Sequence, residues 1–429
     1  MRRLATTDVN FAAAFDALLS QARETTESVD QPVAAIIADV RARGDAALID
    51  YTARFDRLEL TPGTIRISDA EINAATASIP APLSAALDLA ATRIEAFHRA
   101  QLPHDIETTD TAGLTLGMRW GALDAVGLYV PGGKAAYPSS VLMNAIPARV
   151  AGVARVAMCV PTPDGVLNPL VLAAAQRAGV SEIYRIGGAQ AIAALAYGTA
   201  TIAPVDRIVG PGNAYVAEAK RQVFGRVGID GIAGPSEVVI LADAANNAGH
   251  VAMDLLAQAE HDEAAQSILI TDSGAFADAA AAAVAAALQS LPRSEIARAS
   301  WDAHGAIILV RDWDEAIALV NRLAPEHLQL MLPDPEKIFA NIRHAGAAFL
   351  GPWCPEAVGD YIAGPNHVLP TGRTARFASG LSVYDFLKRT TWVSATRDSL
   401  HAIGPAAVAL AETEGLSAHA RSIALRLGR

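Results

Sequence analysis

The chain has 429 residues, of which 52% are hydrophobic, and this length and composition exclude a disordered protein and allow two or three domains. Its 34 basic and 45 acidic residues give a net charge of −11, without a lysine- or arginine-rich run, so nucleic acid is not an expected partner. The two cysteines, Cys159 and Cys354, form neither a CxxC pair nor a disulfide framework, which predicts a reducing, cytoplasmic location.

The sequence carries no pattern typical of export or of a membrane span. The first residues, MRRLATTDVNF, contain two arginines but no apolar block of the length of a signal peptide. The alanine-rich run at 275–288 contains an aspartate and is shorter than the ~20 apolar residues that span a bilayer. We therefore expect no membrane partner and interpret this run as a helix of a soluble protein.

The main elements alternate between helical and extended patterns. The first ~125 residues are mostly helical by periodicity, and we expect them to pack on one domain. From about residue 150, strand and helix patterns follow one another as VARVAMCVP, LNPLVLAAAQRAG, SEIYRIGG, AQAIAALAYG and DRIVGPG, and the alternation restarts at EVVILAD. Such alternation requires crossover connections, so the sequence predicts an α/β fold with two tandem open, mostly parallel, incomplete Rossmann-like sheets.

The last ~45 residues form a separate helical segment. Their pattern predicts two short helices that break at Gly415, with Ser417 as the N-cap of the second. Two short helices bury too little apolar surface to be stable alone. We therefore expect this segment to dock on a domain or on a second subunit.

Three glycine-rich stretches stand at the ends of predicted strands. In VGPGNAY, Gly210, Gly212 and Asn213 follow a strand and open a helix, where backbone N–H groups and the helix dipole favour an anion. Tyr215 occupies the third glycine position of a dinucleotide fingerprint, so a plain turn is the alternative. GLYVPGG, from 127 to Gly133, and RIGGAQA, from 185, are the other two, and together the three predict a crevice lined by loops.

Four polar residues have the chemistry of metal ligands. Gln258 and His261 in LLAQAEH stand at i and i+3 on one helix face, where they could share an ion or form a hydrogen-bonded core pair. Asp360 lies in a Gly/Pro-rich loop, and His419 lies in the first turn of the last helix. Two imidazoles, a carboxylate and an amide oxygen suit zinc with room for substrate.

Adjacent Glu326 and His327, in APEHLQL, lie between a helix and a strand and could supply two proton-transfer groups, with a solvated helix end as the alternative. His367 is held between two prolines and has the same two interpretations. Cys354 is a weak candidate for a thiol nucleophile because nothing nearby is placed to activate it. Cys159, inside VAMCV, is expected in the core.

As an ordered set over nearly the whole chain, eight motifs resemble the histidinol dehydrogenase family: GLYVPGG, RIGGAQAIAALAYGT, VGPGNAYVAEAK, GIDGIAGPSE, LLAQAEHD, APEHLQL, GDYIAGPNHVLPT and ETEGLSAHA. The resemblance implies an NAD-dependent alcohol and aldehyde dehydrogenase that performs the last two steps of histidine biosynthesis. Such an enzyme oxidises L-histidinol through the aldehyde to L-histidine with two NAD⁺ and one bound zinc ion per subunit.

The resemblance also assigns roles by position. It implies catalytic acid/base residues at Glu326 and His327 and NAD contacts at Tyr129, Gln190 and Asn213. The implied zinc ligands are Gln258, His261, Asp360 and His419. The implied substrate contacts are Ser236, His327, His367 and Glu414, together with the four zinc ligands.

The family is a homodimer in which the C-terminal segment of one subunit reaches the partner's site, so the resemblance implies the same here. We accordingly expect an N-terminal helical arm at 1–25 and a larger α/β domain, formed by 26–128 plus 237–380, that carries the metal and acid/base residues. The remaining parts are a second α/β domain at 129–236 that contacts NAD and a C-terminal helical segment at 381–429 that docks on the partner.

Two other classes of protein share some of these features. A zinc-dependent hydrolase acting on a small amino compound would also use zinc with Glu and His, although the HExxH motif is absent from this sequence. A non-catalytic two-domain binding protein would also have two α/β units around a cleft. This second class would leave the adjacent Glu326 and His327 unexplained.

Overall fold

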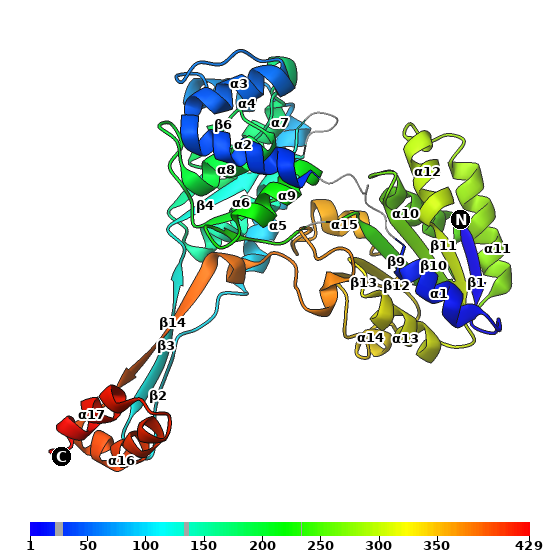
Figure 1. The fold of residues 1–429 in the computed structure, drawn as a ribbon. Helices are drawn as coiled ribbons and strands as arrows, with labels where there is room; N and C mark the ends of the chain where they lie inside the picture. The colour runs from blue at the N-terminus through cyan, green and yellow to red at the C-terminus, as the bar shows by residue number, and fades with distance from the viewer. Residues whose placement is uncertain (22–28, 133–136, 233) are drawn as a thin grey trace.

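The computed structural model describes residues 1–21, 29–132, 137–232 and 234–429 (Figure 1). Within them the strands form a six-stranded sheet of order β1-β11-β10-β9-β12-β13, a five-stranded sheet of order β6-β5-β4-β7-β8 and a three-stranded sheet of order β14-β3-β2. All strand pairs in the two larger sheets are parallel. The prediction of an α/β fold with two tandem parallel sheets is confirmed.

The five-stranded sheet is buried on both faces, because the side chains that point to either face of its strands are apolar. In β5, Val156 and Met158 face one core, while Ala157 and Cys159 face the other, so Cys159 is a core residue as expected. The strands are β4 Ala125–Tyr129, β5 Arg155–Cys159, β6 Glu182–Tyr184, β7 Arg207–Val209 and β8 Gly228–Ile229. Their crossover helices are α6 Pro138–Ala151, α7 Pro169–Ala178, α8 Gly188–Tyr197 and α9 Ala214–Val223.

The helices at 30–99 pack on this five-stranded unit. Helix α2 contacts α8 and α9, α4 contacts α7, and α5 contacts α6. This packing differs from the predicted grouping of 26–128 with 237–380. Periodicity reveals that Val33, Ile36 and Ile37 form an apolar face, but it does not reveal which sheet that face covers. The helices are α2 Asp30–Arg43, α3 Asp45–Asp56, α4 Asp69–Ala77 and α5 Ala81–Arg99.

The six-stranded sheet begins with the N-terminus. Residues of β1 pair with β11 in parallel, so the expected helical arm at 1–25 starts with an edge strand, and Phe15 and Leu18 of the following helix enter the core. The strands are β1 Arg2–Ala5, β9 Glu237–Ala242, β10 Gln266–Thr271, β11 Ala306–Leu309, β12 His327–Met331 and β13 Ala347–Leu350. The helices are α1 Phe11–Leu19, α10 Ala248–Ala259, α11 Gly274–Ala287, α12 Ser294–His304, α13 Trp313–Leu323, α14 Pro335–Phe339 and α15 Glu356–Tyr361.

The antiparallel sheet forms an arm that extends away from both α/β units and carries two helices at its end (Figure 1). It consists of β2 Ile106–Thr109, β3 Thr115–Ala122 and β14 Leu387–Ser394, followed by α16 Arg397–Thr413 and α17 Ser417–Arg426. The break at Gly415 is confirmed, with φ of 73°. Ser417 is the first helical residue rather than the N-cap, which is Leu416 without a side-chain hydrogen bond.

Short 3₁₀ turns complete the described structure at Pro163–Gly165, Thr374–Arg376 and Val383–Phe386. The last of these, η3, leads directly into β14 and therefore forms the base of the arm. None of the helices seen in the described ranges combines the length and the apolar character that a bilayer crossing requires.

The packing of the arm can be tested at Gly117, which faces Trp392 across the β3–β14 pair. A Cβ at Gly117 would lie 2.1 Å from the Trp392 ring, so Gly117→Ala must displace the indole and should destabilise the arm by about 1–3 kcal/mol. Gly121→Ala in the same strand is the matched control, because its Cβ would meet nothing within 4 Å. Hydrogen exchange of β3 and β14 measures the effect, and equal exchange in both variants would contradict it.

Candidate active site

Glu326 and His327 are buried where α13 gives way to β12. Ala324 ends α13 in a left-handed conformation, and His327 is the first residue of β12. The neighbouring strand holds both side chains: the backbone N–H of Glu237 donates to Glu326 Oε2 at 2.9 Å, and His327 Nδ1 donates to the Glu237 carbonyl at 3.1 Å. Since Glu237 begins β9, this pair lies at the amino ends of two parallel strands.

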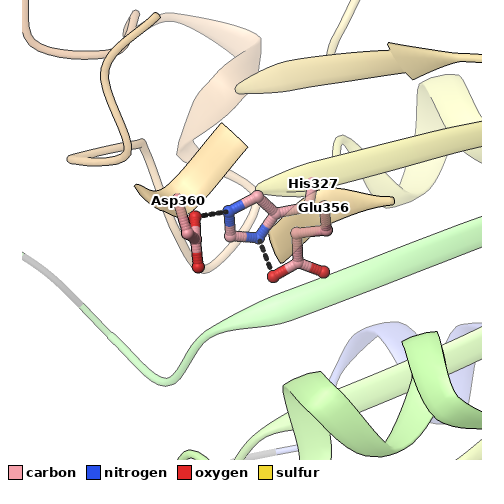
Figure 2. Close-up of side chains that lie close together, drawn as sticks. All are labelled: His327, Glu356 and Asp360. Carbon is pink, nitrogen blue, oxygen red and sulfur yellow. Dashed lines mark ion pairs between the residues drawn. The ribbon is translucent and has the colours of Figure 1, made fainter. Parts of the chain in front are cut away.

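Helix α15 brings two more carboxylates to the same imidazole (Figure 2). Glu356 Oε1 lies 3.5 Å from His327 Nδ1, and Asp360 Oδ1 lies 3.7 Å from His327 Nε2. A Cβ at Gly359 would lie 2.3 Å from the Phe349 ring, so only glycine allows α15 to approach β13 this closely. The i, i+4 spacing then directs Glu356 and Asp360 toward one side of the helix.

Burial and mutual charge shift the protonation of this cluster. Burial raises the pKa of Glu326 to about 7 and that of Glu356 to about 8. Burial alone would lower the pKa of His327, but the charges of Glu356 and Glu326 outweigh it and raise this pKa to about 10. For Asp360, burial opposes ionisation, whereas the close, positively charged imidazole of His327 favours it, and the pKa is lowered overall. The cluster therefore favours a protonated imidazole between carboxylates.

Gln258 and His261 contact each other at the end of α10. Gln258 is fully buried, and its amide Nε2 donates to His261 Nδ1 at 2.9 Å, the contact expected of a core pair. Its Oε1, however, is buried without a hydrogen-bond partner among the described residues. Burial lowers the pKa of His261, and the nearby charge of Asp360 partly opposes this. The amide oxygen of Gln258 thus lacks a partner among the described residues, and the neutral imidazole of His261 lies near Asp360.

The predicted metal ligands are not all together within one chain. Asp360 interacts with His261 and His327, but His419 lies in α17 at the far end of the arm (Figure 1). Among the described residues, three side chains form another group whose ligand atoms lie within 4.8 Å of one another: His327, Glu356 and Asp360. Two candidate donor sets therefore share Asp360.

The residues that resemble substrate contacts lie in three places. His367 is next to the cluster, where its Nδ1 donates to the Asp360 carbonyl at 3.0 Å and Ser140 Oγ lies 3.3 Å from its Nε2. Ser236 immediately precedes β9, beside the Glu237 backbone that holds Glu326 and His327. Glu414 is the C-cap of α16 and is exposed on the arm, away from the cluster (Figure 1).

The three residues that resemble NAD contacts lie at the carboxyl end of the five-stranded sheet. Tyr129 ends β4, and its hydroxyl accepts a hydrogen bond from the Gly188 N–H at 3.1 Å. Gln190 is buried in the first turn of α8, and Asn213 caps α9. The strand order reverses between β4 and β7, and ligands of open α/β sheets bind at such switch points. Gly133 of the first glycine-rich stretch lies outside the described residues.

Two buried carboxyl residues of this region were missed in the sequence. Glu356 precedes Asp360 by four residues, a spacing that places both on one helix face and could have revealed it. Glu237 gave no such signal, because its backbone makes the contacts with Glu326 and His327.

Burial raises the pKa of the Cys159 thiol, which fits an inert core residue.

Two parallel-sheet units and a buried cluster of carboxyl and imidazole groups define an enzyme, and comparisons with known proteins identify its family. The family model described as histidinol dehydrogenase matches residues 19–427. The chain is 66% identical over 427 residues to the histidinol dehydrogenase of Gluconobacter oxydans, covering 100% of this chain and 99% of the relative. It is 63% identical over 428 residues to that of Rhodospirillum rubrum, covering 100% and 99%.

A solved structure gives the same result. The crystal structure of histidinol dehydrogenase from Elizabethkingia anophelis aligns with a TM-score of 0.96 and 37% identity, covering 100% of this chain and 98% of that one. The chain belongs to the histidinol dehydrogenase family. The expectation that it is an enzyme, a dehydrogenase of this family, is confirmed.

Proposed function

We propose that this protein oxidises L-histidinol through L-histidinal to L-histidine with two NAD⁺, the last two steps of histidine biosynthesis, in the cytoplasm. The observation that carries the proposal is the buried contact of Glu326, His327 and Asp360 in a chain of this family. Two successive oxidations at one carbon need both a base for a hydroxyl proton and a base for water, and the adjacent pair supplies both.

The residues around Asp360 fit one zinc ion per subunit. The unpartnered, buried Oε1 of Gln258 is an atom that needs a partner, and the lowered pKa of His261 keeps an imidazole neutral, as a zinc ligand must be. We assign Gln258, His261 and Asp360 as ligands, with His419 of the partner subunit as the fourth. Zinc bound there would hold and orient the imidazole and amine of histidinol.

His327 is the proposed base for the alcohol. Its Nδ1 carries a hydrogen that is donated to the Glu237 carbonyl, so Nε2 is the atom that accepts a proton when the imidazole is neutral. Zinc held by Asp360 would offset one of the carboxylate charges that favour the protonated form, and so would favour this neutral imidazole. This Nε2 is buried without a hydrogen-bond partner in the described ranges. As the alcohol proton reaches Nε2 and hydride leaves the carbinol carbon, Glu326 and Glu356 stabilise the imidazolium that forms. Glu356 is thus a positioning and charge-balancing residue.

Glu326 is the proposed base for the second oxidation. The aldehyde must first add water, and the Glu326 carboxylate can remove a proton from that water as its oxygen bonds to the carbonyl carbon. The hydrate anion would then lose hydride to NAD⁺ and its remaining hydroxyl proton to His327, which gives the carboxylate of histidine. Because the pKa of Glu326 is raised to about 7, its carboxylate form becomes available as the pH rises through neutrality. Burial of both residues protects the reactive aldehyde from side reactions.

The cofactor and the remaining substrate contacts come from other elements. Tyr129, Gln190 and Asn213 surround the switch point at which NAD would bind and accept the hydride. His367 and Ser236 flank the acid/base cluster and would contact histidinol. We propose a homodimer in which the arm reaches the partner's cluster, so that Glu414 of the partner subunit faces the substrate ammonium group.

Turnover with histidinol tests this function directly. The metal-replete protein should reduce NAD⁺ when histidinol is added, giving two NADH per histidinol, and a zinc chelator should abolish the reaction. Reduced nicotinamide is followed by its absorbance and histidine by chromatography. Metal-dependent hydrolysis without NAD reduction would instead favour a zinc hydrolase, and histidinol binding without turnover would favour a binding protein.

Zinc content separates the two donor sets. His261→Asn should weaken zinc affinity by at least the ~10–100-fold that loss of a ligand's hydrogen-bond partner costs, because an imidazole ligand is lost, and should therefore lower the zinc retained per subunit. Glu356→Gln should keep zinc and lose activity, because only the charge beside His327 changes. Elemental analysis of both variants measures this. The opposite pattern would show that His327, Glu356 and Asp360 hold the ion.

Hybrid dimers test the shared site. Glu326→Gln and His419→Asn chains should each be inactive alone, since each homodimer lacks one component in both sites. After subunit exchange, a site with wild-type Glu326 and wild-type His419 from different chains should restore activity to about half that of wild type per hybrid. Activity after mixing is the measurement, with the unmixed dimers as controls. No recovery in verified hybrids would place Glu326 and His419 of the same chain in one site.

A further inference from the structure

A buried ion pair holds one glycine of the proposed cofactor site by both of its backbone polar groups. Lys220, on α9, is 3% exposed, and its Nζ donates to the Gly210 carbonyl at 3.1 Å and to Asp230 Oδ1. Asp230 Oδ2 accepts from the Gly210 N–H at 2.8 Å. Lys220 and Asp230 therefore close a ring of contacts around Gly210, and we call these two residues the clamp.

No residue other than glycine fits at position 210, which the clamp holds. Gly210 has φ of +112°, and a Cβ there would lie 2.1 Å from the Tyr129 carbonyl oxygen. Tyr129 in turn accepts through its hydroxyl from Gly188 at the start of α8. The clamp thus fixes Gly210, the first residue of the loop 210–213, against the end of β4, near which the three proposed NAD contacts lie.

Stability alone is a poor explanation for this ion pair. Burying two charges carries a large desolvation cost, and an apolar pair of similar volume would often be as stable. A buried pair that bonds both polar groups of a neighbouring backbone does, however, restrict that backbone to one conformation. Its geometry suits the positioning of a loop that must be ready to receive a ligand.

The clamp also anchors the chain that leads from one sheet to the other. Asp230 Oδ1 accepts from the Gly231 N–H at 2.8 Å, immediately after β8. From there the chain reaches Ser236 and then Glu237, whose backbone holds Glu326 and His327. The same carboxylate therefore contacts the cofactor loop and the beginning of the connection to the acid/base cluster.

We infer that Lys220 and Asp230 are positioning residues for the nicotinamide dinucleotide, holding loop 210–213 in its binding conformation before the cofactor arrives. The inference rests on the proposed NAD site at Tyr129, Gln190 and Asn213. Loss of the clamp leaves the loop in its competent conformation for only part of the time. If that fraction falls to about a tenth, the apparent Kd for NAD rises about tenfold.

Binding measurements on the zinc-loaded dimer test the inference with Lys220→Met and Asp230→Asn. Both variants should raise the Kd and the KM for NAD⁺ about tenfold, while the KM for histidinol and the zinc content stay within about twofold of wild type. Calorimetry with NAD⁺ gives the Kd, and steady-state kinetics separates the two KM values. A purely structural role would lower the melting temperature without this selective loss of NAD affinity.

Arg155→Met is the matched control, because Arg155 and Glu182 form a half-buried ion pair, 3.0 Å apart, at the amino end of the same sheet. It should lower stability without changing the Kd for NAD⁺. Wild-type protein that binds no NAD⁺ would overturn the proposed function and with it the clamp. If wild type binds NAD⁺ and the folded clamp variants bind it with the same Kd, the proposed function stands and only the positioning role of the clamp is overturned.

Hydrogen exchange of wild-type protein covers the case in which neither clamp variant folds. The Gly210 amide is bonded to Asp230 Oδ2, so this amide should already be protected before NAD⁺ is added. Free exchange that becomes slow only with NAD⁺ would show that the cofactor, rather than the clamp, orders the loop, and would overturn the inference.

Discussion

The parallel pairing of β9 with β12 is the constraint on which the active site depends. It places both backbone groups of Glu237 against the first residues of the neighbouring strand, where the N–H binds the Glu326 carboxylate and the carbonyl accepts from His327. A buried carboxylate without such a partner would cost several kcal/mol, so the sheet makes the acid/base pair possible. Its register also selects the tautomer of His327 and thereby the nitrogen that faces Asp360.

The two sheets contribute opposite ends to function. The proposed NAD contacts follow the usual rule of open α/β folds, because they stand at the carboxyl ends of β4, β6 and β7 around the switch point. Glu326 and His327 do not follow it, since they lie at the amino end of β12. The connection at 230–237 runs from the end of one sheet into the start of the other, so a short covalent path joins the two sites.

Sequence patterns predicted those parts that depend on local order. Alternating strand and helix patterns were sufficient for two parallel sheets, and i, i+3 spacing was sufficient for the contact of Gln258 with His261. The strand β1 was missed because RRLA has no apolar alternation, and it exists through pairing with β11. The helices from α2 through α5 were assigned to the other domain, because the apolar face of an amphipathic helix does not reveal which sheet it will cover.

The candidate site also contains residues that the sequence predicted and residues that only the tertiary structure reveals. Glu326, His327 and Asp360 were found from residue type and resemblance, and the structure places them together. The role of Glu356 depends on the close approach of α15 to Phe349 that Gly359 allows, a tertiary contact that no local pattern encodes. The clamp is a stronger example, because Lys220 and Asp230 stand on different elements and become partners only when β7, α9 and β8 assemble.

The arm holds the remaining proposed site residues, Glu414 and His419, away from the acid/base cluster of their own chain. It carries α16 and α17 away from both cores, and Leu410 on α16, Leu416 between the helices and Leu425 on α17 are exposed by 67%, 44% and 64%. Exposing these apolar side chains to water is unfavourable in free energy. Packing them against a second protein surface would remove that penalty. A partner subunit is the surface that the proposed function supplies, because the same contact would bring Glu414 and His419 to a cluster that lacks them in its own chain.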